Sequence, residues 1–146
     1  MRHPLPGAPL LYQEIEHTAD CGIVVEAEAP AALFEKAALA LSAIMIRPAA
    51  IEAREERSVA AEAGDWADLL HHWLAEVLVV FAVDAFVAAE VTVTEIGPTS
   101  VRGILRGEEF DAARHEFWGE VKAVTYHELA VIRTHAGWQA RVIFDV

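Results

Sequence analysis

Val142-Ile143-Phe144-Asp145-Val146, the last five residues of the sequence, form an apolar, strand-like run with one acidic residue inside it. Aspartate is depleted in β-strands, and a buried aspartate needs a partner or a metal ion. Near the other end of the chain stands His17-Thr18-Ala19-Asp20. If the fold joins the two ends, Asp20, Asp145 and the main-chain carboxylate of Val146 form an oxygen cluster. Such a cluster binds a hard cation or acts on a partner.

The residues that precede this final strand favour β-structure separated by turns. Alternating apolar and polar residues, with turn residues such as Gly97-Pro98 and His135-Ala136-Gly137 between them, indicate antiparallel strands. The final hairpin closes around residues 135–137. Strands are expected at residues 12–16, 22–28, 51–63, 87–95, 100–106, 124–134 and 138–146, and residues 108–120 are expected to be irregular.

Two amphipathic patterns between these strands predict helices. Pro30 opens the first and Pro48 stops it. Asp65 is a good N-cap for the second, with Asp68 three residues later as in a capping box. The apolar stripe of the first helix is Leu33, Phe34, Ala37, Leu41, Ile44 and Met45. The stripe of the second is Trp66, Leu69, Leu70, Trp73, Leu74, Val77, Leu78 and Phe81.

A strand meander with two helices predicts an α+β fold, in which the two helices pack on a largely antiparallel β-sheet. The length of 146 residues fits a single domain with a substantial core. We expect a flexible leader at residues 1–11 and one domain at residues 12–146. No internal repeat or interdomain linker interrupts the sequence.

Composition narrows the functional classes. The net charge of −12 weighs against direct gripping of a phosphate backbone, which needs clustered Lys and Arg. No run of about 18 uncharged apolar residues is present, since the longest candidate, residues 77–89, contains Asp84. The N-terminus lacks the apolar segment of a secretory signal, and Cys21 has no second cysteine to pair with. These features predict a cytoplasmic protein that does not use a membrane.

Each candidate residue also has a simpler explanation. Asp20 can serve local hydrogen bonding in a turn, and Lys122 can be an exposed lysine at a strand start. Thr125, Tyr126 and His127 can form cross-strand surface pairs. At this level the residues alone leave both interpretations open.

Zinc and thiol chemistry are not favoured by the spacing. His71 and His72 are adjacent, so we expect their side chains to point in different directions, unlike the i, i+4 pair of a zinc helix. His115 and His127 lack Cys or His companions at structural-zinc spacing. Cys21 is expected to be a small buried apolar residue, because no base is placed to activate it.

Several motifs together resemble the archease family over roughly residues 12–146. They are His17-Thr18-Ala19-Asp20 with Gly22, Gly107-Glu108 followed by Asp111 and His115, residues 119–127 (GEVKAVTYH) and residues 140–146 (ARVIFDV). Archeases are small, non-catalytic activators of the tRNA-splicing RNA ligase, which joins 2′,3′-cyclic phosphate or 3′-phosphate ends to 5′-hydroxyl ends. That ligase uses GTP and manganese and passes through a guanylylated histidine.

The resemblance implies a role for four residues. Asp20, Asp145 and Val146 match the family's metal ligands, and Lys122 matches a lysine important for activation. An archease speeds guanylylation and supports multiple turnover through an acidic, metal-binding tip. Oxygen-only ligands suit Ca²⁺ best here, with Mg²⁺ or Mn²⁺ as alternatives.

The partner implied is therefore the ligase, with RNA met only indirectly. Two other functions remain open from the residues. One is a metal-dependent hydrolase that uses Asp20 and Asp145 with His17 or His127 as acid or base. The other is a chaperone-like module that binds proteins.

Overall fold

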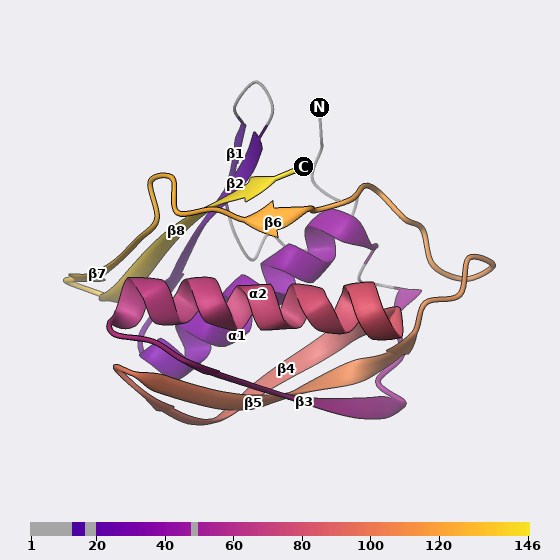
Figure 1. Cartoon of the computed structure of the whole chain (residues 1–146), viewed down its shortest axis with the longest axis horizontal. Helices are drawn as coiled ribbons and strands as arrows, with labels where there is room; N and C mark the ends of the chain where they lie inside the picture. The colour runs from indigo at the N-terminus through magenta and orange to yellow at the C-terminus, as the bar shows by residue number, and fades with distance from the viewer. Residues whose placement is uncertain (1–12, 17–19, 48–49) are drawn as a thin grey trace.

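The computed structural model describes residues 13–16, 20–47 and 50–146 of the chain (Figure 1). Its elements, in chain order, are β1 (Gln13–Glu16), β2 (Asp20–Ala27), α1 (Pro30–Met45), β3 (Glu55–Glu62), α2 (Trp66–Asp84), β4 (Phe86–Gly97), β5 (Ser100–Glu109), β6 (Ala123–Val124), β7 (Ala130–Thr134) and β8 (Gly137–Asp145). The expected leader lies outside the described residues, so the division into residues 1–11 and 12–146 stays a prediction.

The described strands form two antiparallel sheets, with both helices between them (Figure 1). One sheet has the order β1-β2-β8-β6, with β7 also paired to β8, and the other has the order β3-β5-β4. Each helix contacts strands of both sheets. The predicted α+β class and antiparallel pairing are confirmed. The sequence did not indicate that the strands divide into two sheets, because that division depends on pairings between distant segments.

Helix α1 is buried on nearly every side because sheets cover it from two directions. All six residues of its predicted stripe are buried, and Ala38, Ala40, Ser42 and Ala43 are buried as well. Small side chains at these positions let the layers approach closely. Trp73 of α2 ties the helices together, since its indole N–H donates to the carbonyl of Phe34 at 3.1 Å. The alanine-rich composition thus follows from the three-layer packing.

Helix α2 begins as the sequence predicts. The Asp65 side chain accepts a hydrogen bond from the Asp68 N–H at 2.8 Å, which makes Asp65 the N-cap. Leu69, Leu70 and Trp73 on its core face are fully buried. By length and composition alone this helix is apolar enough to cross a membrane. It lies between the two sheets (Figure 1), with one face packed on the core and with Val79 and Val83 exposed.

Several strand boundaries differ from those expected, and three of the differences bear on the residues discussed below. β2 begins at Asp20 itself, so Asp20 lies in a strand and not in a turn. β5 continues to Glu109, which places Glu108 inside the sheet. The expected strand at 124–134 is two strands, β6 and β7, separated by a loop in which Glu128 has a positive φ of 51°. Residues 124–134 contain no Gly or Pro to mark the break, which is why the sequence pattern concealed it.

Candidate functional site

The beginning of β2 and the end of β8 lie side by side in the sheet. Asp20 is the direct cross-strand partner of Asp145, and on the other side of β8 Ala123 of β6 is paired with Asp145. Residues directly opposite in an antiparallel pair project from the same face, with Cβ atoms about 5 Å apart. The two aspartates are therefore neighbours on one face of the sheet. We call Asp20 and Asp145 the acidic pair.

The next residues inward face the core. Cys21 is paired with Phe144, and both are buried, with relative exposures of 3% and 0%. The acidic pair lies on the opposite face: Asp145 is exposed and Asp20 is half-buried. The expectation that Asp145 is a buried acid in a core strand is wrong: it is exposed because it lies at the end of β8, whereas Ile143, two residues earlier on the same face, is fully buried. The expected burial of Cys21 is confirmed.

Lys122 and Val146 both lie beside the acidic pair. The Lys122 N–H donates to the carbonyl of Asp145 at 2.7 Å, so the lysine is held next to this end of β8 while its side chain is exposed. Val146 follows Asp145 and packs, half-buried, against the core. The remaining residues of the N-terminal motif, His17, Thr18 and Ala19, lie outside the described residues.

The acidic pair suits a hard cation. Like charges directly opposite each other in a sheet are unfavourable, and a divalent ion between them removes that repulsion. Its donor atoms are all oxygens, the ligand type that Ca²⁺, Mg²⁺ and Mn²⁺ prefer. Two side chains at an exposed strand end leave most coordination positions open to water or to groups of a partner.

A second group of potential ligands lies on α2, where none was expected. Asp68, His71 and His72 each offer one ligand atom, and these atoms lie within 4.8 Å of one another. His71 and His72 were expected to point in different directions and therefore not to share a metal ion, but their ligand atoms lie close enough to do so. Their ring centroids are 5.6 Å apart, and Asp68 lies three residues before one and four before the other. On a helix, i+3 and i+4 residues share a face with residue i.

Tyr126, in the loop between β6 and β7, covers this group. Its ring stacks on His71 with centroids 3.9 Å apart, and its hydroxyl donates to Asp68 Oδ1 at 2.9 Å. That hydrogen bond to a carboxylate raises the pKa of Tyr126. The expected surface pairing of Tyr126 is therefore wrong: its partners are on α2. The only signal in the sequence was the Asp-x-x-His-His spacing.

Comparison with known proteins identifies the family. The sequence model of the family described as "Archease protein family (MTH1598/TM1083)" matches residues 12–146. This chain belongs to the archease family. Archeases from Methanopyrus kandleri and Methanosarcina mazei are 40% and 35% identical to it. These matches cover 92% and 97% of this chain, and 99% and 100% of the two relatives. The resemblance seen in the motifs is confirmed.

Solved structures carry the same fold. The solution structure of Methanobacterium thermoautotrophicum protein 1598 matches with a TM-score of 0.80 at 32% identity. It covers 93% of this archease and 99% of that chain. A crystal structure from Thermotoga maritima, titled as an archease and possible chaperone, matches with a TM-score of 0.64 at 19% identity, which supports the fold alone. It covers 95% of this archease and 100% of that chain.

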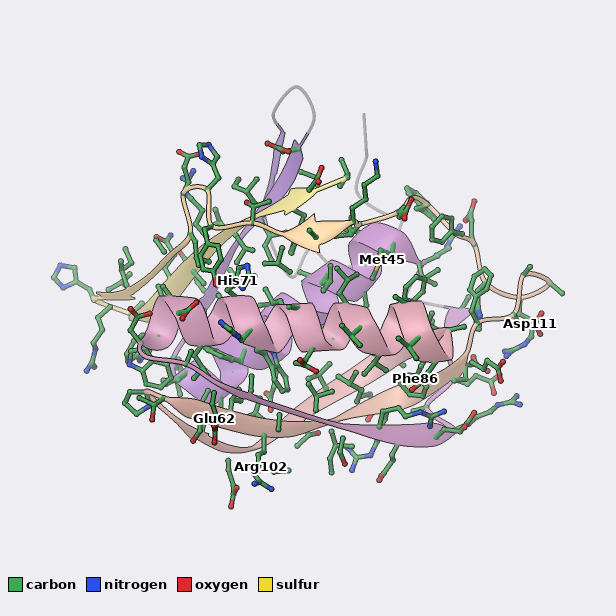
Figure 2. The ribbon with its side chains drawn as sticks, in the orientation of Figure 1. Met45, Glu62, His71, Phe86, Arg102 and Asp111 are labelled. Carbon is green, nitrogen blue, oxygen red and sulfur yellow. The ribbon has the colours of Figure 1, made fainter. Side chains whose placement is uncertain are left out.

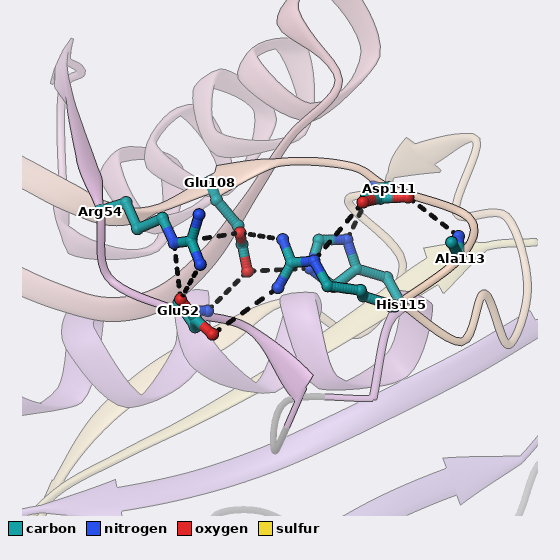
Figure 3. Close-up of polar contacts among 7 residues, drawn as sticks. Glu52, Arg54, Glu108, Asp111, Ala113 and His115 are labelled. Atoms are coloured by element: carbon teal, nitrogen blue, oxygen red, sulfur yellow. Dashed lines mark hydrogen bonds and ion pairs between the residues drawn. The ribbon is translucent and has the colours of Figure 1, made fainter.

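Glu108, Asp111 and His115, which the motif resemblance singled out, form a polar network in which Glu108 and His115 are buried and Asp111 is exposed (Figure 3). Glu108 accepts hydrogen bonds from the Glu52 N–H at 2.7 Å and from Arg114. The Asp111 N–H donates to His115 Nδ1 at 2.8 Å, so in the neutral ring Nε2 carries the proton and donates to Glu108 at 3.0 Å.

This network fixes the loop that leads toward Lys122. Glu108 and His115 are both only 4% exposed. The hydrogen bond from Arg114 holds the pKa of Glu108 at about 2, below its ordinary value of 4.5, although burial acts in the opposite direction. The same pairing raises the pKa of Arg114. We call Glu108, Arg114 and His115 the loop clamp. Its groups already bind one another, which is typical of a structural role.

Proposed function

We propose that this archease is a non-catalytic activator of the GTP- and manganese-dependent tRNA-splicing RNA ligase in the cytoplasm. It promotes guanylylation of the ligase and multiple turnover in the joining of 3′-phosphate or 2′,3′-cyclic phosphate ends to 5′-hydroxyl ends. The observation that carries this proposal is the direct pairing of Asp20 with Asp145 at an exposed end of the sheet. Family membership over residues 12–146 supports the proposal, because activation of this ligase is the role that the resemblance to archeases implies.

The acidic pair is the part that acts. With Val146 as the third ligand, it holds a divalent ion, Ca²⁺ in preference to Mg²⁺ or Mn²⁺, through oxygen atoms. An ion held by so few protein ligands keeps several positions for water. It is therefore able to exchange those waters for oxygen atoms in the active site of the ligase, where nucleotide phosphates and manganese meet.

Lys122 supplies the positive charge of the same tip. Its backbone is fixed by the hydrogen bond to Asp145, while its side chain is exposed and its ammonium is suited to a phosphate of the bound nucleotide. Because Lys122 lies beside the acidic pair in space, one small tip of the molecule contacts both a phosphate and a metal ion.

Charge supports a protein partner and not RNA as the main contact. The net charge of −12 opposes binding to a phosphate backbone and favours docking onto a basic, RNA-binding protein. Electrostatic attraction of this kind raises the association rate and weakens with salt. Stimulation that falls as ionic strength rises is therefore expected.

The test is a ligation assay with the cognate ligase present in limiting amount, with GTP and Mn²⁺. Wild-type protein should restore many turnovers, and Asp20→Asn, Asp145→Asn and Lys122→Ala should each lose at least about tenfold of the stimulation, the equivalent of about 1.4 kcal/mol. Glu62→Gln, an exposed acid on the other sheet, is the matched control. Equal stimulation by all five proteins would reject the proposal.

The same preparation distinguishes the alternatives. Phosphatase or nuclease turnover by the purified protein, lost in Asp145→Asn, would indicate the metal-dependent hydrolase. Protection of unrelated unfolded proteins that is insensitive to the Asp20 and Asp145 variants would indicate the chaperone-like module.

A further inference from the structure

We propose that Asp68, His71 and His72 form a second metal site, separate from the acidic pair, that takes a nitrogen-preferring divalent ion of the zinc class. Figure 2 shows His71 projecting from α2 toward the segment that contains β6. The proposal does not depend on ligase activation, because it rests on ligand geometry alone. It adds a site that differs from the acidic pair in both ligand chemistry and position.

The hydrogen bonds of His71 define which nitrogen is available. Its Nε2 lies 3.0 Å from the carbonyl oxygen of Val124, and a carbonyl only accepts, so Nε2 carries the proton. In the neutral ring, Nδ1 then has a lone pair. Nδ1 is buried and has no hydrogen-bond partner within residues 13–16, 20–47 and 50–146. A buried acceptor without a partner is unfavourable, and a bound cation satisfies it.

This pattern is the usual one for metal-binding histidines. One ring nitrogen binds the metal, and the other donates to a carbonyl or carboxylate that fixes the tautomer and the ring orientation. The Val124 carbonyl occupies that supporting position here. Tyr126 supports Asp68 in the same way. Its hydroxyl donates to Asp68 Oδ1, and its ring packs on His71. Both ligands are thus oriented in advance of binding.

The remaining geometry also fits. Two imidazoles on one tetrahedral ion have ring centres roughly 5 Å apart, given metal–nitrogen bonds of about 2.1 Å. The His71 and His72 centroids are 5.6 Å apart in an edge-to-face arrangement. His72 Nε2 already lies 3.3 Å from Asp68 Oδ1, a spacing that one bridging ion can span. A small rotation of the exposed His72 side chain completes the set.

The ligand types select the metal. Two imidazoles and one carboxylate suit Zn²⁺ and its neighbours, whereas Ca²⁺ and Mg²⁺ prefer oxygen ligands throughout. Three protein ligands leave a fourth position for water. Because the supporting groups belong to β6 and the following loop, ion binding would fasten α2 to the segment that continues from Lys122. The fold thus separates an oxygen site at the sheet end from a nitrogen site on the helix.

The experiment measures Zn²⁺ binding to the metal-free, untagged full chain by competition with a chromogenic chelator. Wild type should bind one Zn²⁺ at this site, and His72→Gln and Asp68→Asn should each weaken that binding by about tenfold or more. Ca²⁺ in excess should not compete. His72 is exposed, so its replacement leaves the core intact. His135→Gln, another exposed histidine, is the matched control, and Asp145→Asn should bind Zn²⁺ as wild type does.

A nitrogen-15 NMR spectrum of the histidine rings identifies the ligand atom. On Zn²⁺ addition the Nδ1 signal of His71 should shift while its Nε2–H remains protonated. Unchanged Zn²⁺ affinity in the Asp68→Asn, His72→Gln double variant would overturn the proposal, as would loss of Zn²⁺ binding in Asp145→Asn alone. Either result leaves the ligase-activation proposal untouched, because that proposal is judged by turnover.

Discussion

The loop clamp and the acidic pair handle carboxylates in opposite ways. Glu108 is buried and surrounded by Arg114, His115 and a backbone N–H, so its charge is compensated within the fold. Asp20 and Asp145 stand opposite each other at an exposed strand end, so each is placed beside a like charge. A compensated buried charge stabilises the fold, whereas two adjacent like charges that are open to solvent, one exposed and one half-buried, are suited to an external cation.

The largest effect expected from this contrast is loss of stability in the clamp. Glu108→Gln removes the buried carboxylate that binds both Arg114 and His115, and leaves Arg114 with only its weaker contacts to Asp111 and Glu52. Because Glu108 is buried but Arg114 is partly exposed, the expected loss is that of an unsatisfied buried hydrogen-bond network, about 1–3 kcal/mol. Urea unfolding followed by circular dichroism should show this loss.

Its neighbour gives the control. Glu109 is exposed on the same strand, so Glu109→Gln should change the free energy of unfolding by less than about 0.5 kcal/mol. Equal stability of the two variants would mean that the clamp contributes nothing beyond a surface charge.

Acid should weaken the clamp over a defined range. The pKa of Glu108 is about 2 in the folded protein against an ordinary 4.5, so the unfolded chain takes up this proton first. The stabilisation is therefore complete above about pH 5 and declines as the pH falls from 4.5 toward 2. The difference in unfolding free energy between wild type and Glu108→Gln should shrink over that range. A difference that stays constant from pH 6 to pH 2.5 would contradict the assigned partners.

Local signals in the sequence predicted the helices well. Pro30, the Asp65 N-cap and the apolar stripes are determined by neighbours three or four residues away, so they can be recognised without tertiary structure. The division into two sheets was not predictable in this way, since it depends on β8 pairing with β2 more than a hundred residues earlier.

The candidate sites show the same limit. Asp20 and Asp145 were joined in one oxygen cluster on the assumption that the two ends of the chain meet, and the resemblance to archeases implied the same ligands, while the register of β2 with β8 supplies their adjacency. The Asp68, His71 and His72 group was missed because its supporting partners, Val124 and Tyr126, come from a distant loop. Likewise, Glu108 was expected in an irregular polar segment. Its buried position could not be predicted locally, because its partners are spread over residues 52–115.

An added segment after Val146 should harm function selectively. If Val146 is the third metal ligand and the tip enters the active site of the ligase, an added hexahistidine segment blocks both metal binding and entry of the tip. The same segment before residue 1 should leave both Ca²⁺ binding and stimulation of guanylylation near the wild-type level. Stimulation of guanylylation and Ca²⁺ binding by calorimetry are the two measurements. Equal activity of the two tagged proteins would mean that the acidic pair acts without Val146, and would restrict the tip to Asp20, Asp145 and Lys122.

The smallest effect expected is a gain of stability at the acidic pair. Asp145→Asn removes one of two like charges that face each other across β2 and β8, so it should stabilise the metal-free protein by roughly 0.2–1 kcal/mol at low ionic strength. Because Asp145 is exposed, salt should screen the repulsion and erase most of this gain. Excess Ca²⁺ should reverse the order, since it stabilises only a protein that binds it, by about 2.7 kcal/mol at a hundred times its dissociation constant. Thermal unfolding at low salt, high salt and saturating Ca²⁺ gives all three comparisons. A variant less stable than wild type without Ca²⁺ would show that Asp145 is structural, as Glu108 is, and the contrast between the two regions would fail.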